Sequence, residues 1–127
     1  MAIVLPDENS KKIDAIFDAL TENDIIYTSQ LLWYEVANIF NNLLRRKRYI
    51  FEEVESFFPK FYSISLTTDF EIGVNYSKKI FNLCKELNLS SYEAAYLELA
   101  DRKKAVLCTL DDGLISAAKK HGVAVIN

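Results

Sequence analysis

The alternation of strand-like and helical segments most constrains what this chain can fold into. Short runs of apolar and β-branched residues predict strands at Ala2–Val4, Asp24–Thr28, Tyr62–Leu66, Ala105–Thr109 and Val123–Ile126. Helical periodicity covers Asn9–Thr21, Gln30–Lys47, Phe51–Phe58, Asp69–Leu87, Ser91–Lys103 and Asp111–His121. Strands that alternate with helices predict an α/β fold, in which helices flank a mainly parallel sheet. Most of the predicted strands are continuously apolar, which does not fit a sheet with one solvent-exposed face. We therefore expect both faces of the sheet to be covered.

Length and composition favour one domain over residues 1–127, since half of the 127 residues are apolar. No apolar run approaches the length that crosses a bilayer and no leader follows Met1, which predicts a cytoplasmic protein without a membrane anchor. The formal charge of -3 argues against nucleic-acid binding by bulk electrostatics. The basic run Arg45–Arg48 ends a predicted helix, where it complements the helix dipole; contact with phosphates is the alternative. Cys84 and Cys108 are expected to be reduced core thiols.

Glu35 borders the predicted buried stripe of the Gln30–Lys47 helix. It projects between Leu31 and Ile39, away from the face that carries the asparagines. A glutamate in a first turn is attracted by the helix dipole and can reach solvent at the sheet edge, which is the ordinary interpretation. The alternative interpretation is that Glu35 has a polar role at a functional site.

Glu93 raises the same question on the Ser91–Lys103 helix. It shares a face with Leu97 and Ala100. Ser90, three residues earlier, makes a capping box possible, in which the serine caps the helix and the glutamate reaches back to the Ser90 N–H. Capping and a site role therefore both remain open.

Asp111 follows the carboxyl end of the strand that finishes at Thr109. Thr109 and Asp112 resemble a cap pair, which leaves one of the two aspartates unnecessary for capping. We expect Asp111 to be the free one and to point into the crevice beyond the sheet.

Three carboxylates, each expected in the first turn of a helix, would meet at one end of a parallel sheet and would need a cation there. Carboxylate oxygens without His or Cys favour Mg²⁺ or Mn²⁺. Such an ion polarises a phosphoryl oxygen and generates hydroxide from bound water. The only histidine, His121, is predicted in the last turn of the final helix before Gly122, so no catalytic triad is proposed.

The segments "LLWYEVANIF", "LSSYEAAYLELA" and "VLCTLDDGLISAAKKHGVAVI" resemble, in order, the acidic motifs of PIN-domain ribonucleases, especially the VapC-like toxins of toxin-antitoxin pairs. The resemblance runs over nearly the whole chain, and "LPDENS" is similar to the loop before the second helix of that family. It implies a PIN-like three-layer sandwich, a Mg²⁺ or Mn²⁺ site and endonucleolytic cleavage of RNA. It also implies homodimers and inhibition by a cognate antitoxin protein.

The resemblance assigns the site residue by residue. Glu35 matches the motif after the second strand, Glu93 the position usually held by aspartate in the third motif, and Asp111 the acid of the fourth. Thr109 would orient the cluster through its hydroxyl, with Asp112 as a further auxiliary acid.

The chain departs from the family at its first motif. Family members begin with a strand that ends in an aspartate, whereas this chain starts almost directly at "LPDENS" and is abbreviated relative to them. "MAIVL" then serves as the central strand, or another chain completes the sheet. Asp7 would partly replace the missing ligand.

Three hypotheses follow from these observations. The first is a metal-dependent endoribonuclease of the VapC-like type. The second is a catalytically impaired PIN-like domain that binds an antitoxin or RNA without cutting, because one ligand is lost. The third is an unrelated receiver-like α/β domain with an acidic Mg²⁺ pocket, which is disfavoured because its acidic pair should end an early strand.

Overall fold

The computed structural model describes residues 18, 19, 21 and 23–126. Its strands are β1 (Ile26–Ser29), β2 (Leu66–Asp69), β3 (Leu107–Cys108) and β4 (Val125–Ile126). Its longer helices are α2 (Leu31–Arg45), α5 (Val74–Leu87), α6 (Ser91–Arg102) and α7 (Asp112–His121), and two short helices are α3 (Phe51–Glu55) and α4 (Pro59–Ser63). The predicted α/β class is confirmed.

The strands form two parallel pairs. β1 lies beside β2, with Ile26 opposite Leu66, and β3 lies beside β4, with Leu107 opposite Val125. Within the described residues these pairs make two separate two-stranded sheets. The parallel direction is as predicted, whereas one continuous sheet is not seen in this part of the chain. The strand predicted at Ala2–Val4 lies outside the described residues, as does nearly all of the helix predicted at Asn9–Thr21.

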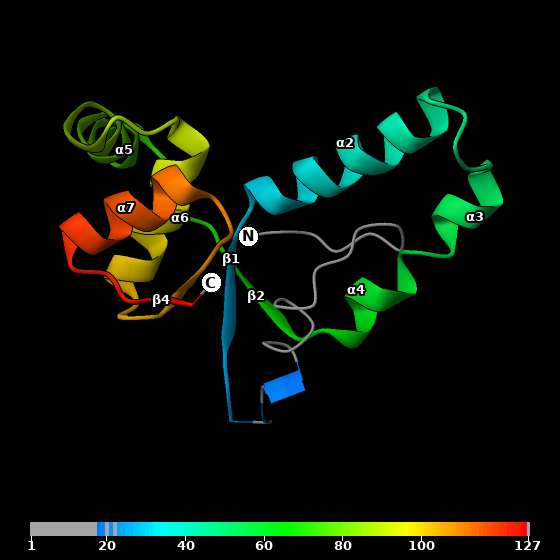
Figure 1. Ribbon diagram of the computed structural model, residues 1–127, viewed down its shortest axis with the longest axis horizontal. Helices are drawn as coiled ribbons and strands as arrows, with labels where there is room; N and C mark the ends of the chain where they lie inside the picture. Colours follow the sequence, from blue (N-terminus) through cyan, green and yellow to red (C-terminus); the bar gives the residue numbers. More distant parts are fainter. Residues whose placement is uncertain (1–17, 20, 22, 127) are drawn as a thin grey trace.

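Helix α6 is the centre of the main core. Every residue from Ala94 to Ala100 is buried, and the helix contacts α5, α7, β1 and β3. Figure 1 shows α5, α6, α7 and β4 on one side of the β1–β2 pair and α2, α3 and α4 on the other. Because α6 touches a strand of each sheet, it fixes the two sheets relative to one another.

A second, smaller core holds the arm formed by α2, α3 and α4. The buried residues of α2 recur at helical spacing and are Leu32, Val36, Phe40 and Leu43. The Phe40 ring meets Phe58 edge to face, with 4.9 Å between centroids, and Phe57 and Phe61 lie close to it. These aromatic contacts fold α3 and α4 back along α2.

The helix predicted at Phe51–Phe58 is shorter than expected. It ends at Glu55, and a new helix starts at Pro59. Proline has no N–H to donate to the carbonyl four residues earlier, so it is suited to the first position of a helix and not to its interior.

The strand predicted at Tyr62–Leu66 was wrong by about four residues. Tyr62 and Ser63 end α4, and the strand runs from Leu66 to Asp69 instead. The Phe61 contact with Phe40 keeps the start of this segment helical despite the strand propensity of Tyr62 and Ile64. The helix predicted from Asp69 consequently begins only at Val74, after Gly73, whose φ of 106° favours glycine.

The strands are not covered on both faces, contrary to the prediction. Ile26 and Tyr27 are half-buried, and Thr67 and Ile126 are exposed. Two-stranded sheets offer too little area for helices to cover both sides. Among the helices of the described part, none combines the length and apolar character needed to cross a membrane.

Candidate functional site

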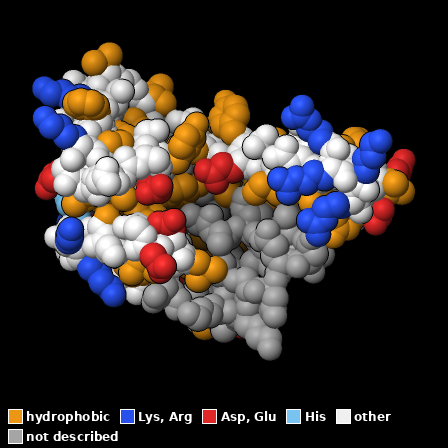
Figure 2. All heavy atoms as spheres, turned by 45° about the horizontal axis from the view of Figure 1, so that its top comes forward, with side chains coloured by type: hydrophobic (Ala, Val, Ile, Leu, Met, Phe, Trp, Pro, Cys, Tyr) orange, Lys and Arg blue, Asp and Glu red, His pale blue; other side chains and the backbone are white. Residues whose placement is uncertain are grey.

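The three acids that the sequence singles out lie near the starts of three helices, α2, α6 and α7. Figure 1 draws the N-terminal ends of α2 and α7 toward the middle of the molecule, and Figure 2 shows several acidic side chains on the face that it presents. We call Glu35, Glu93 and Asp111 the acidic site. Each of them lies near the start of a helix that follows a strand or loop, which is where an α/β topology places site residues.

Glu35 lies in the second turn of α2, which corrects the prediction of a first-turn residue, because α2 begins at Leu31 and its first turn has no acid. Its side chain is half-buried, as expected for a residue at the border of the apolar stripe. Among the described residues the Glu35 carboxylate has no hydrogen bond or ion pair. A half-buried carboxylate that no cation neutralises is available to a ligand.

Glu93 lies in the first turn of α6 and forms half of the predicted capping box. The Glu93 N–H donates to Ser90 Oγ at 3.2 Å, so Ser90 caps the helix. The reciprocal bond from the Ser90 N–H to the Glu93 carboxylate does not occur among the hydrogen bonds of the described residues. The Glu93 side chain is half-buried. The Glu93 carboxylate therefore takes no part in capping the helix.

Replacing Ser90 by alanine is expected to lower the free energy of unfolding by about 1 kcal/mol, the usual effect of losing an N-cap. Glu93→Gln should change it far less, because the Glu93 carboxylate makes no capping bond. Urea unfolding of both variants and of Ser91→Ala, an exposed neighbour, measures this. A larger loss in Glu93→Gln than in Ser90→Ala would show that the carboxylate has a structural role.

Asp111 is the N-cap of α7, so the prediction that it is free of capping was wrong. Its Oδ1 accepts a hydrogen bond from the Leu114 N–H at 2.7 Å, and its φ of -78° and ψ of 119° are those of a cap. Asp112 is the first helical residue instead. A β-carbon at Gly113 would lie 3.3 Å from Asp111 Oδ1, so glycine leaves room for this bond. Only Oδ2 of Asp111 remains for another ligand.

Thr109 supports Asp111 as an auxiliary residue. It is buried, and its Oγ1 accepts a hydrogen bond from the Asp111 N–H at 3.1 Å. The hydroxyl thus holds the turn that carries Asp111. Asp112 is exposed, and Asp7 lies outside the described residues.

Tyr96 is a further polar side chain of α6 that the sequence analysis did not single out. Its side chain is 8% exposed, and its hydroxyl has no hydrogen-bond partner among the described residues. Burial and then the negative charge of Glu35 raise the pKa of Tyr96 to about 12, and the Thr28 hydroxyl partly offsets this. The signal in the sequence is the three-residue spacing from Glu93, which places both side chains on one face of α6.

The donor chemistry of the acidic site fits a hard divalent cation. Carboxylate and hydroxyl oxygens are present, and no imidazole or thiolate is among them. The buried Tyr96 hydroxyl without a partner also fits a region built to bind a polar group. However, among the described residues no group of three or more acidic, His or Cys side chains is close enough to hold an ion. Within the described residues, Glu35, Glu93 and Asp111 therefore do not form a compact ligand set.

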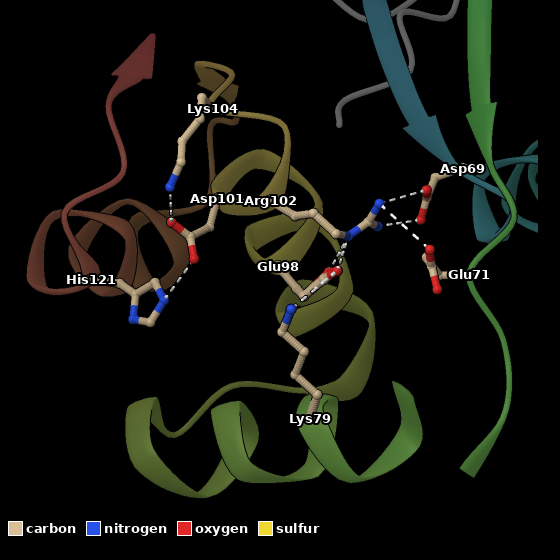
Figure 3. A network of polar contacts seen from close by, with 8 residues as sticks. All are labelled: Asp69, Glu71, Lys79, Glu98, Asp101, Arg102, Lys104 and His121. Atoms are coloured by element: carbon tan, nitrogen blue, oxygen red, sulfur yellow. Dashed lines mark hydrogen bonds and ion pairs between the residues drawn. The ribbon is translucent and has the colours of Figure 1, made fainter. Parts of the chain in front are cut away.

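The most extensive polar network lies at the other end of α6, and the sequence analysis missed it (Figure 3). Arg102 binds Asp69 through both terminal nitrogens, at 3.0 and 2.6 Å, and its Nε donates to Glu98 Oε1 at 2.6 Å. Lys79 Nζ lies 3.9 Å from the same Glu98 oxygen, and Glu71 lies 4.0 Å from Arg102. The hydrogen bonds to Asp69 and Glu98 raise the pKa of Arg102. This network joins β2, α5 and α6.

The remaining sequence predictions concern His121 and the cysteines. His121 is in the last turn of α7 before Gly122, whose φ of 79° ends the helix, as predicted. Its Nε2 lies 3.5 Å from Asp101 Oδ2. Cys84 and Cys108 are free and half-buried, and burial raises the pKa of the Cys108 thiol. Neither belongs to the acidic site.

The basic run Arg45–Arg48 is exposed at the far end of α2, where Figure 2 shows basic side chains over the arm. Arg45 is in the last turn of the helix, in agreement with the dipole interpretation. Contact with phosphates stays a prediction.

Comparison with known proteins supports the fold and not a particular activity. No family model matches this chain, and no curated protein matches it. Its structure is similar to the crystal structure of PAE2754 from Pyrobaculum aerophilum, with a TM-score of 0.61 and 22% sequence identity. The match covers 77% of this chain and 69% of that one. The chain therefore shares the fold of that protein over most of its length.

Proposed function

We propose that this chain is a Mg²⁺- or Mn²⁺-dependent endoribonuclease with a PIN-like three-layer fold, of the VapC-like type. The observation that carries the proposal is the pair of half-buried carboxylates, Glu35 and Glu93, which have no partner among the described residues. Both are at positions that resemble the acidic motifs of the PIN family. RNA as substrate, a cognate antitoxin protein as inhibitor and a homodimer come from the same resemblance.

The residues of the acidic site would hold the ion through oxygen atoms. Glu35, Glu93 and Oδ2 of Asp111 are the donors, because Oδ1 of Asp111 accepts the capping bond. The ion supplies polarisation of a phosphoryl oxygen and a hydroxide from bound water. Thr109 contributes by fixing the turn at Asp111, and the helix N-termini add positive potential for a phosphate.

A second candidate function is the impaired PIN-like domain that binds an antitoxin or RNA without cutting. One observation favours it: in the described part of the chain, no three potential ligands are close enough together for a metal. A domain that has lost its catalytic ligands keeps its fold and its binding surfaces. The two candidates differ in a single measurable property, which is hydrolysis of RNA.

The test is cleavage of a panel of single-stranded and structured RNAs in the presence of Mn²⁺. We expect the 127-residue chain to cut and Glu93→Gln, purified identically, to fall to the background of contaminating nucleases. Chelation of the metal should abolish the activity of the unmodified chain. If a folded sample cuts no RNA above the Glu93→Gln background, the nuclease proposal is wrong and the binding domain replaces it.

A further inference from the structure

Helix α2 exposes one face to solvent along most of its length. Tyr34, Asn38, Asn41 and Arg45 recur at helical spacing and are all exposed, and Tyr34 is exposed to 75%. We call these four residues the outer stripe. The buried residues of α2 lie on the opposite side of the helix, where they form the core of the arm. The outer stripe therefore contributes nothing to that core.

The outer stripe changes in chemical character from one end of the helix to the other. An aromatic ring lies at its start, two side-chain amides follow, and a guanidinium lies at its end. The stripe holds no acid, and the one carboxylate of α2 is Glu35. Glu35 is three residues before Asn38, so it borders the stripe. A stripe of eleven helical steps is about 17 Å long, which suits an extended polymer that passes Glu35 of the acidic site.

The aromatic end of the stripe is widened by Trp33. Its indole Nε1 donates to Thr68 Oγ1 at 3.0 Å, and its side chain is 40% exposed. The hydrogen bond to β2 thus holds the indole in place and leaves part of it open to solvent. Ordered aromatic side chains that remain exposed are suited to stacking against the bases of a single-stranded nucleic acid.

The basic end of the stripe carries more positive charge than the helix dipole calls for. Arg45, Arg46, Lys47 and Arg48 are all exposed, whereas the dipole at a helix C-terminus amounts to about half a negative charge. Among the described residues, Arg45, Arg46 and Lys47 make no ion pair, not even with the acids of the next helix, α3. Three unpaired cations at one helix end are complementary to a row of phosphates.

We propose that the outer stripe, together with Trp33 and the basic end of α2, is a binding surface for single-stranded RNA. Bases stack on Tyr34 and Trp33, and the amides of the stripe form hydrogen bonds with the strand. Arg45, Arg46 and Lys47 bind its phosphates. A single strand is specified because the bases of a duplex are already stacked and cannot reach aromatic side chains. This inference rests on the proposed function, which supplies RNA as the polymer.

The test is binding of a fluorescein-labelled single-stranded RNA of about 12 nucleotides, within the usual range of site sizes. Anisotropy is measured in EDTA, so that no metal-dependent cleavage occurs. Tyr34→Ala should weaken binding at least about fivefold, because stacking of a base on an aromatic ring is typically worth that much. Replacing Arg45, Arg46 and Lys47 together by glutamine should reduce the slope of log Kd against log salt by about two, since each phosphate contact contributes about 0.7.

Two control variants match these changes at exposed positions away from the stripe. Tyr62→Ala removes a tyrosine of α4 that is 87% exposed, and it should bind RNA like the unmodified chain. Replacing Lys78, Lys85 and Lys120 together by glutamine removes the same charge from α5 and α7 and should leave the salt slope unchanged. Equal effects of the two triple variants would overturn the inference, because they would show that only net charge matters. Thermal unfolding should be alike in all variants.

Two other ligands separate this partner from its alternatives. RNA duplex of the same sequence should bind more weakly than the single strand, and equal affinity would overturn the inference because no base could then be stacking. Vesicles rich in phosphatidylserine offer negative charge without bases. Binding to these vesicles without binding to RNA would likewise overturn the inference and assign the surface to a membrane.

The outcomes also separate this inference from the nuclease proposal. If Tyr34→Ala and the basic triple variant weaken RNA binding as expected, but the unmodified chain cuts no RNA with Mn²⁺, the binding surface stands and the nuclease proposal fails. If RNA is cut while both variants bind it like the unmodified chain, the nuclease proposal stands and the binding surface fails. If the unmodified chain binds no single-stranded RNA, the binding surface is wrong whatever the result of the cleavage assay.

Discussion

Replacing Arg102 by leucine is expected to lower the free energy of unfolding by about 3 kcal/mol. Arg102 holds Glu98, whose side chain is 2% exposed, and it binds Asp69 through both terminal nitrogens. Without the guanidinium, the remaining cation beside Glu98 in the described part of the chain is Lys79, at 3.9 Å. Removing one partner of a buried ion pair leaves the other charge buried without compensation, which costs about 3–5 kcal/mol. We expect the lower end, because Arg102 itself is a quarter exposed.

Urea unfolding at fixed ionic strength measures this effect. Lys104→Gln is the matched control, because the Lys104 side chain is 86% exposed and its ion pair with Asp101 is at 4.0 Å; it should change stability by less than about 0.5 kcal/mol. Adding Glu98→Leu to Arg102→Leu should recover much of the loss, since it removes the buried charge. A loss below about 1 kcal/mol in Arg102→Leu would show that water, not Arg102, compensates Glu98.

Replacing Asp111 by asparagine is expected to reduce RNA cleavage at least 100-fold while leaving the fold intact. Asparagine caps a helix as well as aspartate does, so the bond from the Leu114 N–H to the side chain is preserved. The negative charge at Oδ2 is lost, and with it one ligand of the proposed cation. Metal ions contribute several kcal/mol of transition-state stabilisation, and each 1.4 kcal/mol is about tenfold in rate.

The comparison with Asp112→Asn isolates this effect. Asp112 is exposed, adjacent and equally charged, so its substitution changes the local charge without removing a ligand. We expect its cleavage rate to remain within about threefold of the unmodified chain, a change of less than 1 kcal/mol. Thermal unfolding of both variants should be alike. Full activity in Asp111→Asn, with normal stability, would mean that Asp111 is a helix cap and nothing more.

The local spacing of apolar and polar residues was enough to predict most helices. Helix α2 follows the apolar spacing from Leu32 to Leu43, and α6 and α7 begin within one residue of the predicted positions. Ser90 and Gly122 mark helix ends through local hydrogen bonds and backbone conformation. These features depend on residues at most a few positions apart, so tertiary contacts did not override them.

The elements that were predicted wrongly depend on distant residues. Tyr62 and Ser63 have strand-like neighbours, but the contact of Phe61 with Phe40 keeps them in a helix. The pairing of Ser29 with Asp69 places Asp69 in a strand, although it was expected to begin a helix. Strand propensity is weak because it reflects packing against partners that lie far away in the chain.

The candidate site also has features that the sequence predicts and features that depend on tertiary contacts. Sequence alone picked out Glu35 and Glu93 as acids beside apolar helix faces, and Asp111 as an acid after the carboxyl end of a strand. It assigned the cap of α7 to the wrong aspartate, since Asp111 and Asp112 are both suited to capping and only the backbone conformation selects one. Tertiary structure alone determines that the Tyr96 hydroxyl is buried and that Arg102 binds Asp69. Both arise where α6 meets β1 and β2, and no pattern of neighbouring residues records which side chains meet across that contact.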